Sequence, residues 1–175
     1  MGLFDKRPEK LRYDKEECRR KKERMRQIFD RVVEDGDSYR VLLATKDGQP
    51  RQQGLFGGSA ASRNHYIQGH PAVIPAVAQD DGRMALVLVD PSLDRHSDAT
   101  FLETGALSGA SYDQGSHRAC LRYRGGGEPE LLYIGDTGSR APRGIPNVVQ
   151  EEERTDFLEF LHALCPPGGG GAAPS

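Results

Sequence analysis

Two His-x-x-Cys pairs are the first candidates for chemistry in the sequence, His117 with Cys120 and His162 with Cys165. Together they would supply four ligands of the kinds that bind zinc. Positions three apart on a β-strand point to opposite faces of the sheet, so His117 and Cys120 would not chelate one ion on a regular strand. We therefore expect no bound metal and no cofactor, with Cys120 and Cys165 acting as small apolar side chains.

The second candidate is the string Asp136-Thr137-Gly138-Ser139. It resembles the catalytic loop of aspartic proteases, in which two aspartates share a proton and activate water. The string occurs once, and Gly135 precedes it where retropepsin-like enzymes have large apolar residues. We therefore predict that Asp136 is a turn residue at the end of a strand. A small hydrolase or aspartic-type protease that uses Asp136 remains the alternative.

The segment Asp94-Arg95-His96-Ser97-Asp98 places a histidine beside carboxylates and a serine. These residue types occur in hydrolytic triads, so the His96 loop is a second possible centre for the hydrolase alternative. His65 and His70 flank a short glycine-containing segment and could be surface sites. No third partner for a triad is visible in the sequence, so we predict no catalytic residue.

A dense run of basic residues gives the chain a charge asymmetry. Residues 1–26 hold eleven Lys or Arg against six Asp or Glu, whereas residues 27–175 have a net charge of −7. The predicted binding residues of this basic arm are Arg19, Arg20, Lys21, Lys22, Arg24 and Arg26. A protein partner or self-association with the acidic body is the favoured target; nucleic acid and an anionic lipid surface are the others.

Length, composition and cysteine content bound the remaining possibilities. A chain of 175 residues is one domain with appendages. Its longest apolar run, Met84 to Val89, is far too short to cross a bilayer. Three cysteines spread over three regions predict reduced thiols rather than a disulfide framework. The start of the sequence has no apolar signal region, and we therefore expect a cytoplasmic protein.

Two helices are predicted, one at each end of the folded part. Asp14 is a plausible N-cap with Glu17 as its capping-box partner, and Gly36 is a natural stop. The apolar stripe of this first helix is continuous only from Met25 onward, so its basic front half is expected to project from the body. The second helix follows Gln150 and carries its apolar residues at helical spacing, namely Phe157, Leu158, Phe160, Leu161 and Leu164.

Between the helices the sequence changes to short β-like runs separated by turn signals such as Asp80-Asp81-Gly82. Seven strands are predicted, at residues 39–45, 72–79, 83–90, 99–103, 110–113, 117–124 and 130–135. Residues 46–71 contain several Gly, Ser and Ala residues and are predicted to form a long flexible loop. The Gly- and Pro-rich residues 166–175 are predicted to be a disordered tail.

Seven antiparallel strands followed by one amphipathic helix resemble the pleckstrin-homology (PH) superfold, in which the helix plugs one end of a bent β-barrel. Residues 83–164 are similar to bacterial PH-like domains, through the strand Met84 to Val89, the run Phe101 to Ala110 and the segment Phe157-Leu158-Glu159-Phe160-Leu161. The chain has no Trp, which eukaryotic members typically place in the closing helix, and residues 72–79 lack the basic side chains of phosphoinositide-binding members. The resemblance therefore implies the fold, and lipid headgroup binding is not carried over.

The sequence therefore predicts an α+β protein with a basic N-terminal helical arm (residues 1–36), a PH-like seven-stranded antiparallel barrel or sandwich closed by a C-terminal helix (residues 37–165), and a tail. The predicted function is a non-catalytic binding or scaffolding module for protein partners. A hydrolase and a nucleic-acid-binding protein are the alternatives from other classes.

Overall fold

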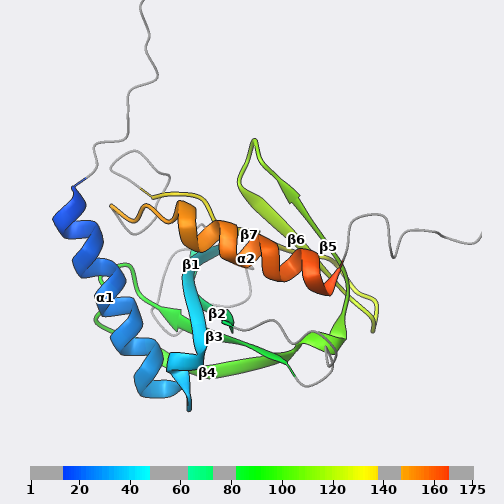
Figure 1. The fold of residues 1–175 in the computed structure, drawn as a ribbon, viewed down its shortest axis with the longest axis horizontal. Coiled ribbons are helices and arrows are strands. Elements are labelled where there is room, and N and C mark those ends of the chain that lie inside the picture. The colour runs from blue at the N-terminus through cyan, green and yellow to red at the C-terminus, as the bar shows by residue number, and fades with distance from the viewer. Residues whose placement is uncertain (1–13, 48–62, 73–81, 138–146, 166–175) are drawn as a thin grey trace, which may run out of the picture.

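The computed structural model describes residues 14–47, 63–72, 82–137 and 147–165. The elements in chain order are α1 (Lys15–Val32), η1 (Gly36–Ser38), β1 (Tyr39–Asp47), β2 (Arg63–Pro71), β3 (Arg83–Val89), β4 (His96–Glu103), η2 (Thr104–Ala106), β5 (Leu107–Asp113), β6 (Arg118–Tyr123), β7 (Glu130–Tyr133) and α2 (Glu151–Leu164). An α+β architecture with a helix at each end of seven antiparallel strands is thus confirmed (Figure 1).

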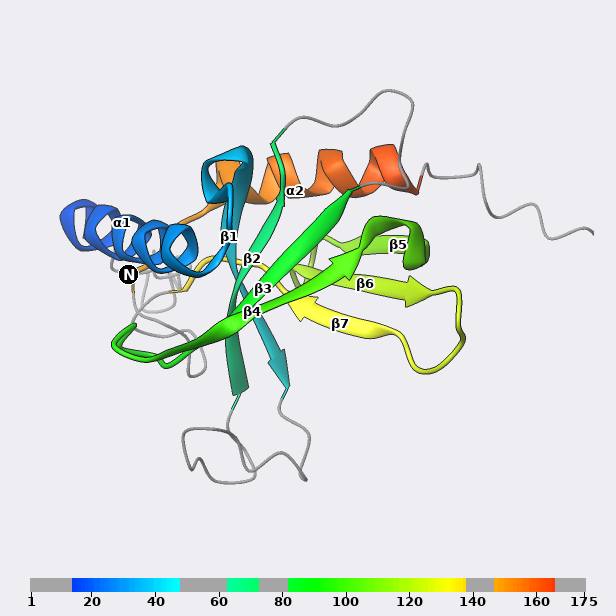
Figure 2. The same cartoon turned by 90° about the horizontal axis from the view of Figure 1, so that it is seen from below.

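The sheet consists of two antiparallel meanders, β1–β4 and β5–β7, in the spatial order β4-β3-β2-β1-β7-β6-β5. One residue pair, Thr45 opposite Tyr133, joins them where β1 meets β7. β4 and β5 do not pair with one another, so the sheet is open and is not a closed barrel. Figure 2 shows the two meanders bending around a common interior, with α2 above the strands and α1 beside β1.

Helix α1 covers one face of the β1–β4 meander, which we call the outer face. Met25, Ile28 and Phe29 of the helix are buried, in one cluster with side chains of β1, β2 and β3 that include Leu43, Ile67, Ala85, Val87 and Val89. Gly69 of β2 is required for this contact, because a Cβ atom there would lie 2.2 Å from Cζ of Phe29. The ring of Phe29 occupies the space that a side chain at position 69 would take.

The front half of α1 also packs on the body, so the expectation that it projects is wrong. Cys18 is 3 % exposed, and its Sγ lies 3.7 Å from the carbonyl oxygen of Val149. Asn147 donates a 2.6 Å hydrogen bond to Glu17. These polar contacts hold the first turns where the apolar stripe is thin, a type of contact that hydrophobic periodicity does not detect. Residues 15–32 are therefore part of the domain rather than an arm; residues 1–13 lie outside the described part.

Helix α2 covers the opposite face, which we call the inner face. Phe157, Phe160 and Leu161 are buried. They share a cluster with inner-face side chains of both meanders, which include Leu42, Met84, Leu107, Leu121 and Leu132. The two phenyl rings stack with centroids 6.4 Å apart. The amphipathic pattern predicted for this helix is confirmed, because its apolar residues face the sheet, whereas Glu151 and Glu152 of its first turn are exposed.

The second strand was predicted in the wrong place. β2 is Arg63–Pro71, inside the segment 46–71 that the glycine content marked as a loop, and β1 extends to Asp47. Asn64, Gln68 and His70 hide the strand in a hydropathy pattern, because these polar residues all pair with β1, and Gln68 also pairs with β3. Residues 48–62 of that loop, residues 73–79 of the expected strand and the predicted tail lie outside the described residues.

Candidate functional site: a cleft between β1 and the two helices

Among the described strands, the first half of β1 has a neighbour on one side only. β2 pairs with the whole of β1, from Tyr39 opposite Pro71 to Asp47 opposite Arg63. On the other side, β7 reaches β1 only at Thr45. Before that point, α1 and α2 flank the open edge of β1 in place of a strand.

A glutamine side chain pairs with β1 where β7 does not reach. The N–H of Leu43 donates to Oε1 of Gln150 at 2.8 Å, and Nε2 of Gln150 donates to the carbonyl oxygen of Leu43 at 2.8 Å. The same Nε2 lies 3.2 Å from the carbonyl oxygens of Ile134 and Gly135. Gln150 is 1 % exposed. Its amide therefore does what an adjacent strand would do, and it ties β1 to the chain that follows β7.

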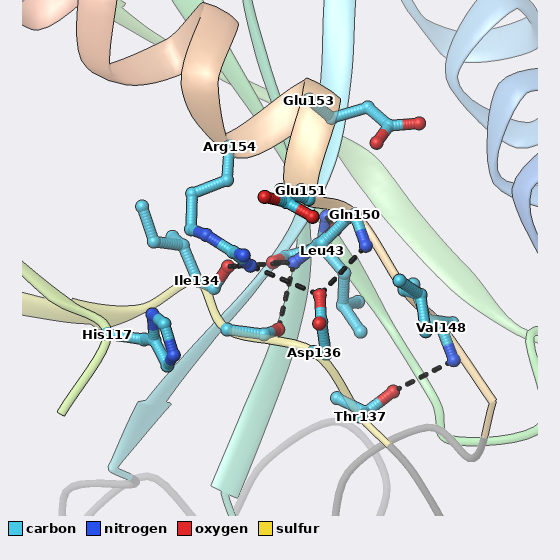
Figure 3. A network of polar contacts seen from close by, with 12 residues as sticks. Leu43, His117, Ile134, Asp136, Thr137, Val148, Gln150, Glu151, Glu153 and Arg154 are labelled. Carbon is cyan, nitrogen blue, oxygen red and sulfur yellow. Dashed lines mark hydrogen bonds and ion pairs between the residues drawn. The ribbon is translucent and has the colours of Figure 1, made fainter. Parts of the chain in front are cut away.

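The predicted turn residue Asp136 belongs to the same network (Figure 3). One carboxylate oxygen accepts from the backbone N–H of Gln150 at 2.9 Å and from Nη1 of Arg154 at 3.1 Å. The Arg154 side chain is 11 % exposed and also donates to the carbonyl oxygen of Ile134 at 3.3 Å. Asp136 thus holds the start of α2, where an anionic group suits the helix dipole. Gly138 and Ser139 of the motif lie outside the described residues.

A cleft of about 360 Å³ opens beside this network, between α1, β1 and α2. Its lining combines apolar and charged side chains, namely Lys22, Met25, Arg26, Tyr39, Arg40, Val41, Leu42, Gln150, Glu153 and Asp156. Two ion pairs cross it: Nζ of Lys22 lies 2.7 Å from Glu153, and Arg40 pairs with Asp156. Each pair joins two different elements, so α2 contacts both α1 and β1 through charges at the wall of the cleft.

The six basic residues predicted for binding divide into two groups. Four of them bond to the protein itself. Arg19 pairs with Glu16 and Glu23 on its own helix, Lys22 pairs with Glu153, and Arg24 donates to the carbonyl oxygen of Leu93 at 3.1 Å. Arg26 donates to the carbonyl oxygen of Tyr39 at 2.6 Å, and it also bonds Gly36 and pairs with Asp30.

Arg20 and Lys21 have no ion pair with any described residue. They line a separate shallow hollow with Glu17, Arg24, Ser92 and Leu93. The run of cations is therefore not one uniform binding surface. Lys22 and Arg26 face the cleft, whereas Arg20 and Lys21 face the hollow beside the turn after β3.

The histidines do not gather at one place. Nδ1 of His96 lies 3.0 Å from the backbone oxygen of Ser97, and Nδ1 of His117 lies 2.8 Å from the hydroxyl of Tyr112. Burial raises the pKa of that tyrosine. His65 is buried at 3 % exposure, and His162 is exposed on α2. Among the described residues no three His, Cys, Asp or Glu side chains are grouped to hold a metal ion.

His70, like His65, is buried, so the expectation of surface sites at these two residues is wrong. It is 1 % exposed, and its ring centroid lies 5.4 Å from that of Phe157 and 5.1 Å from that of Phe160. Burial lowers its pKa to about 4; the charge of Asp156 opposes this shift and that of Arg40 adds to it. His70 is therefore a neutral aromatic filler between β2 and α2, directly behind the Arg40–Asp156 pair.

Comparison of the chain with family models, with curated proteins and with solved structures finds no match. Neither helix of the described part has the length and apolar character that crossing a membrane requires. The cleft residues that sequence reasoning missed are Tyr39, Arg40, Gln150, Glu153 and Asp156. For Gln150 and Glu153 the sequence indicated only their place at the polar start of the second helix.

Proposed function

We propose that this protein is a non-catalytic binding module that docks a protein partner at the cleft between α1, β1 and α2. The observation that carries the proposal is the lining of the cleft, in which three elements place charged side chains of both signs around Met25, Val41 and Leu42. Met25 and Leu42 are already buried, so Val41, which is partly buried, supplies the apolar contact left for a partner, and the charges supply orientation and selectivity.

The exposure of the charges supports a docking role. The Arg40 side chain is 52 % exposed and its partner Asp156 is 32 % exposed. Exposed ion pairs contribute roughly 0–1 kcal/mol to stability, so the fold does not depend on them. Arg40 and Asp156 can therefore also bond an incoming protein without loss of the fold. A volume of about 360 Å³ is at the lower end of the range of about 300–1,000 Å³ that is typical of ligand sites.

A PH-like identity of the domain is part of the proposal. It is supported by the order of the elements, seven antiparallel strands and then one helix, and by the two phenyl rings of α2 that pack into the interior of the bent sheet. α1 extends that arrangement, because it covers the outer face and supplies one wall of the cleft.

The alternatives from other classes receive less support from the described residues. The carboxylate of Asp136 already accepts two hydrogen bonds that anchor α2, which favours a structural role over a catalytic one. The basic residues of α1 are mostly engaged with Glu16, Glu23, Glu153 and backbone carbonyls, which reduces the charge available to a phosphate backbone.

Site-specific photo-crosslinking in the source cells tests this function. A benzophenone side chain replaces Arg40 at the cleft in one variant and the exposed Arg122 of β6, away from the cleft, in a matched control. We expect one protein to be crosslinked from position 40 and not from position 122. Reversing the charge of Glu153 and Asp156 together should abolish that adduct. Identical adducts from both positions, or an adduct that the reversal leaves unchanged, would contradict docking at the cleft.

A further inference from the structure

We infer that the cleft binds a short extended peptide segment, which adds to the open edge of β1 through the backbone of Val41. This inference rests on the proposed function and names the chemistry by which the partner is recognised. The ligand class is a peptide group flanked by uncharged polar side chains, whether it belongs to a loop of a folded protein or to a free peptide.

The direction of the Val41 backbone groups follows from the alternation of an antiparallel ladder. Successive residues of a strand point their N–H and C=O groups to opposite edges. Both backbone groups of Leu43 point away from β2, because they bond Gln150. Thr45, two residues on, faces Tyr133 of β7 on the same edge. Two residues before Leu43, the N–H and C=O of Val41 therefore also point away from β2.

The hydrogen bonds on the opposite edge of β1, toward β2, give the same alternation. The N–H of Ala72 donates to the carbonyl oxygen of Ser38 at 2.9 Å, so the even-numbered position 38 bonds toward β2. Leu42 lies opposite Gln68 and Arg40 lies opposite His70 in the same register. The β2 ladder thus uses the even-numbered residues of β1 and leaves Val41 to the cleft, which it lines.

The neighbours of Val41 along this edge are already bonded. The carbonyl oxygen of Tyr39 accepts from Nη1 of Arg26 at 2.6 Å, and Leu43 has both of its groups on Gln150. Neither the N–H nor the C=O of Val41 has a hydrogen bond to a described residue on this edge. The open edge is therefore one residue long. It offers a peptide the two hydrogen bonds of one ladder pair, the same two that the Gln150 amide makes with Leu43.

The walls of the cleft restrict the ligand further. Oε2 of Glu153 is buried and bonds to no residue that the structure describes, so it can accept from a donor beside the peptide group. The cations of the lining, Lys22, Arg26 and Arg40, are all engaged with acidic or carbonyl oxygens. A polar segment that carries a hydroxyl or amide donor fits this arrangement, whereas a strongly acidic segment would have to displace Glu153 or Asp156.

NMR of the full chain tests the inference with N-acetyl-Ala-Ser-Ala-amide as the probe. In the free protein the Val41 amide should exchange with solvent at least tenfold faster than the hydrogen-bonded amides of Leu42 and Leu43. A tenfold difference in exchange rate corresponds to about 1.4 kcal/mol in the free energy of opening. Addition of the probe to about 10 mM, well above a millimolar dissociation constant, should shift the Val41 amide resonance and slow its exchange.

The matched variants are Val41→Pro and Val41→Ile. Proline removes the N–H that would bond the peptide and also fixes φ, and it is tolerated on a strand edge whose N–H is unpaired, so Val41→Pro should fold and weaken probe binding at least tenfold. Val41→Ile keeps the N–H and should bind within about threefold of the parent. A Val41 amide as protected as that of Leu42 in the free chain, no shift at Val41 with the probe, or full binding by folded Val41→Pro overturns the inference.

If Val41→Pro does not fold, the exchange rates and probe shifts of the parent chain decide the question. The crosslink from position 40 separates the two proposals. A folded Val41→Pro protein that still gives the crosslink overturns strand addition and leaves docking at the cleft standing. Loss of probe binding and of the crosslink together supports strand addition, and no crosslink from position 40 in a chain that keeps Val41 contradicts the proposed function itself.

Discussion

The two faces of strand β2 are closed in different ways. On the outer face, Ile67 and Gly69 pack under α1, and the ring of Phe29 fills the space above the glycine. On the inner face, the neighbouring residues Gln68 and His70 are each 1 % exposed. Both amide atoms of Gln68 and Nδ1 of His70 lack a hydrogen-bond partner among the described residues. Under α1 the outer face is closed by apolar side chains, whereas the inner face under α2 buries polar atoms that no described residue bonds.

Because of this difference, the stability of the inner face depends on the apolar contacts that α2 makes with it. A buried polar atom without a partner costs roughly 1–3 kcal/mol, which the apolar contacts of α2 must offset. The phenyl rings of Phe157 and Phe160 lie against His70 and supply part of that compensation. The helix that closes the domain is therefore the element on which the inner face depends most.

The largest expected effect is that of removing a buried phenyl ring of α2. Phe160 is 1 % exposed in the inner cluster, so Phe160→Ala should destabilise the protein by about 3–5 kcal/mol. Leu131→Ala is the control, because Leu131 is 54 % exposed and its truncation should change stability by less than about 0.5 kcal/mol. Chemical denaturation measures both. Equal denaturation midpoints for Phe160→Ala and the parent would show that Phe160 does not hold α2 on the sheet.

The second effect is a loss of stability in mild acid. The pKa of His70 is about 4 in the folded protein and 6.5 when unfolded. Below pH 6.5 the unfolded state therefore binds more protons than the folded state, and stability falls as the pH is lowered. Between pH 6.5 and 5, above the range in which most carboxylates titrate, the loss should be about 2 kcal/mol.

Two variants assign this pH dependence. His70→Phe should remove most of the slope between pH 6.5 and 5, because no group at position 70 then takes up a proton. His162→Gln is the control, since His162 is exposed on α2 and its removal should leave the slope unchanged. Denaturation midpoints at several pH values measure both. A slope that survives in His70→Phe would show that another group is responsible.

The third prediction tests the shape of the outer face. Gly69→Ala places a Cβ atom 2.2 Å from Cζ of Phe29, and overpacking of this kind costs about 1–3 kcal/mol. In a Phe29→Leu background the clash is relieved, so the same glycine substitution should cost less than about 0.5 kcal/mol. A double-mutant cycle measures the coupling. Additive effects would show that Phe29 does not set the limit at position 69.

The fourth prediction concerns the link between the strands and α2. Asp136→Asn keeps an oxygen that accepts from the Gln150 N–H but loses the charge that Arg154 faces. We expect a loss of about 1–2 kcal/mol, with a folded protein as the result. Arg154→Met in the same background should add little, because the two side chains act as one unit. Additive losses from the two substitutions would contradict that coupling.

The sequence predicted the parts of the fold that depend on local signals. The side chain of Asp14 accepts from the N–H groups of Glu16 and Glu17, as an N-cap does, and α2 occupies the stretch marked by Phe157, Phe160 and Leu161. β2 was missed because its pattern is set by Gln68 and His70, whose polarity in the sequence gives no hint that they are buried.

The cleft was missed for a different reason. Its contacts join residues far apart in the chain: Leu43 and Gln150 are 107 positions apart, and Lys22 and Glu153 are 131 apart. No spacing rule relates such pairs. The basic residues of α1 were recognised by type, but which of them face the cleft depends on how α1 packs against β1 and α2, and that is known only once the helix has been placed over Gly69.

The smallest expected effect is that of the charges between the helices. Lys22 and Glu153 are 35 % and 29 % exposed in their ion pair, and pairs of this kind contribute roughly 0–1 kcal/mol. Lys22→Gln should therefore cost less than about 1 kcal/mol, because Met25, Ile28 and Phe29 hold α1 on the sheet without it. Raising the salt from about 0.1 M to about 1 M shortens the Debye length from about 10 Å to about 3 Å and should reduce even that difference. Denaturation of the parent and Lys22→Gln at both salt concentrations measures it, with Lys21→Gln, outside the cleft, as the control. A loss of several kcal/mol for Lys22→Gln, or a large drop in parent stability at high salt, would mean that charge rather than apolar packing holds α1 in place.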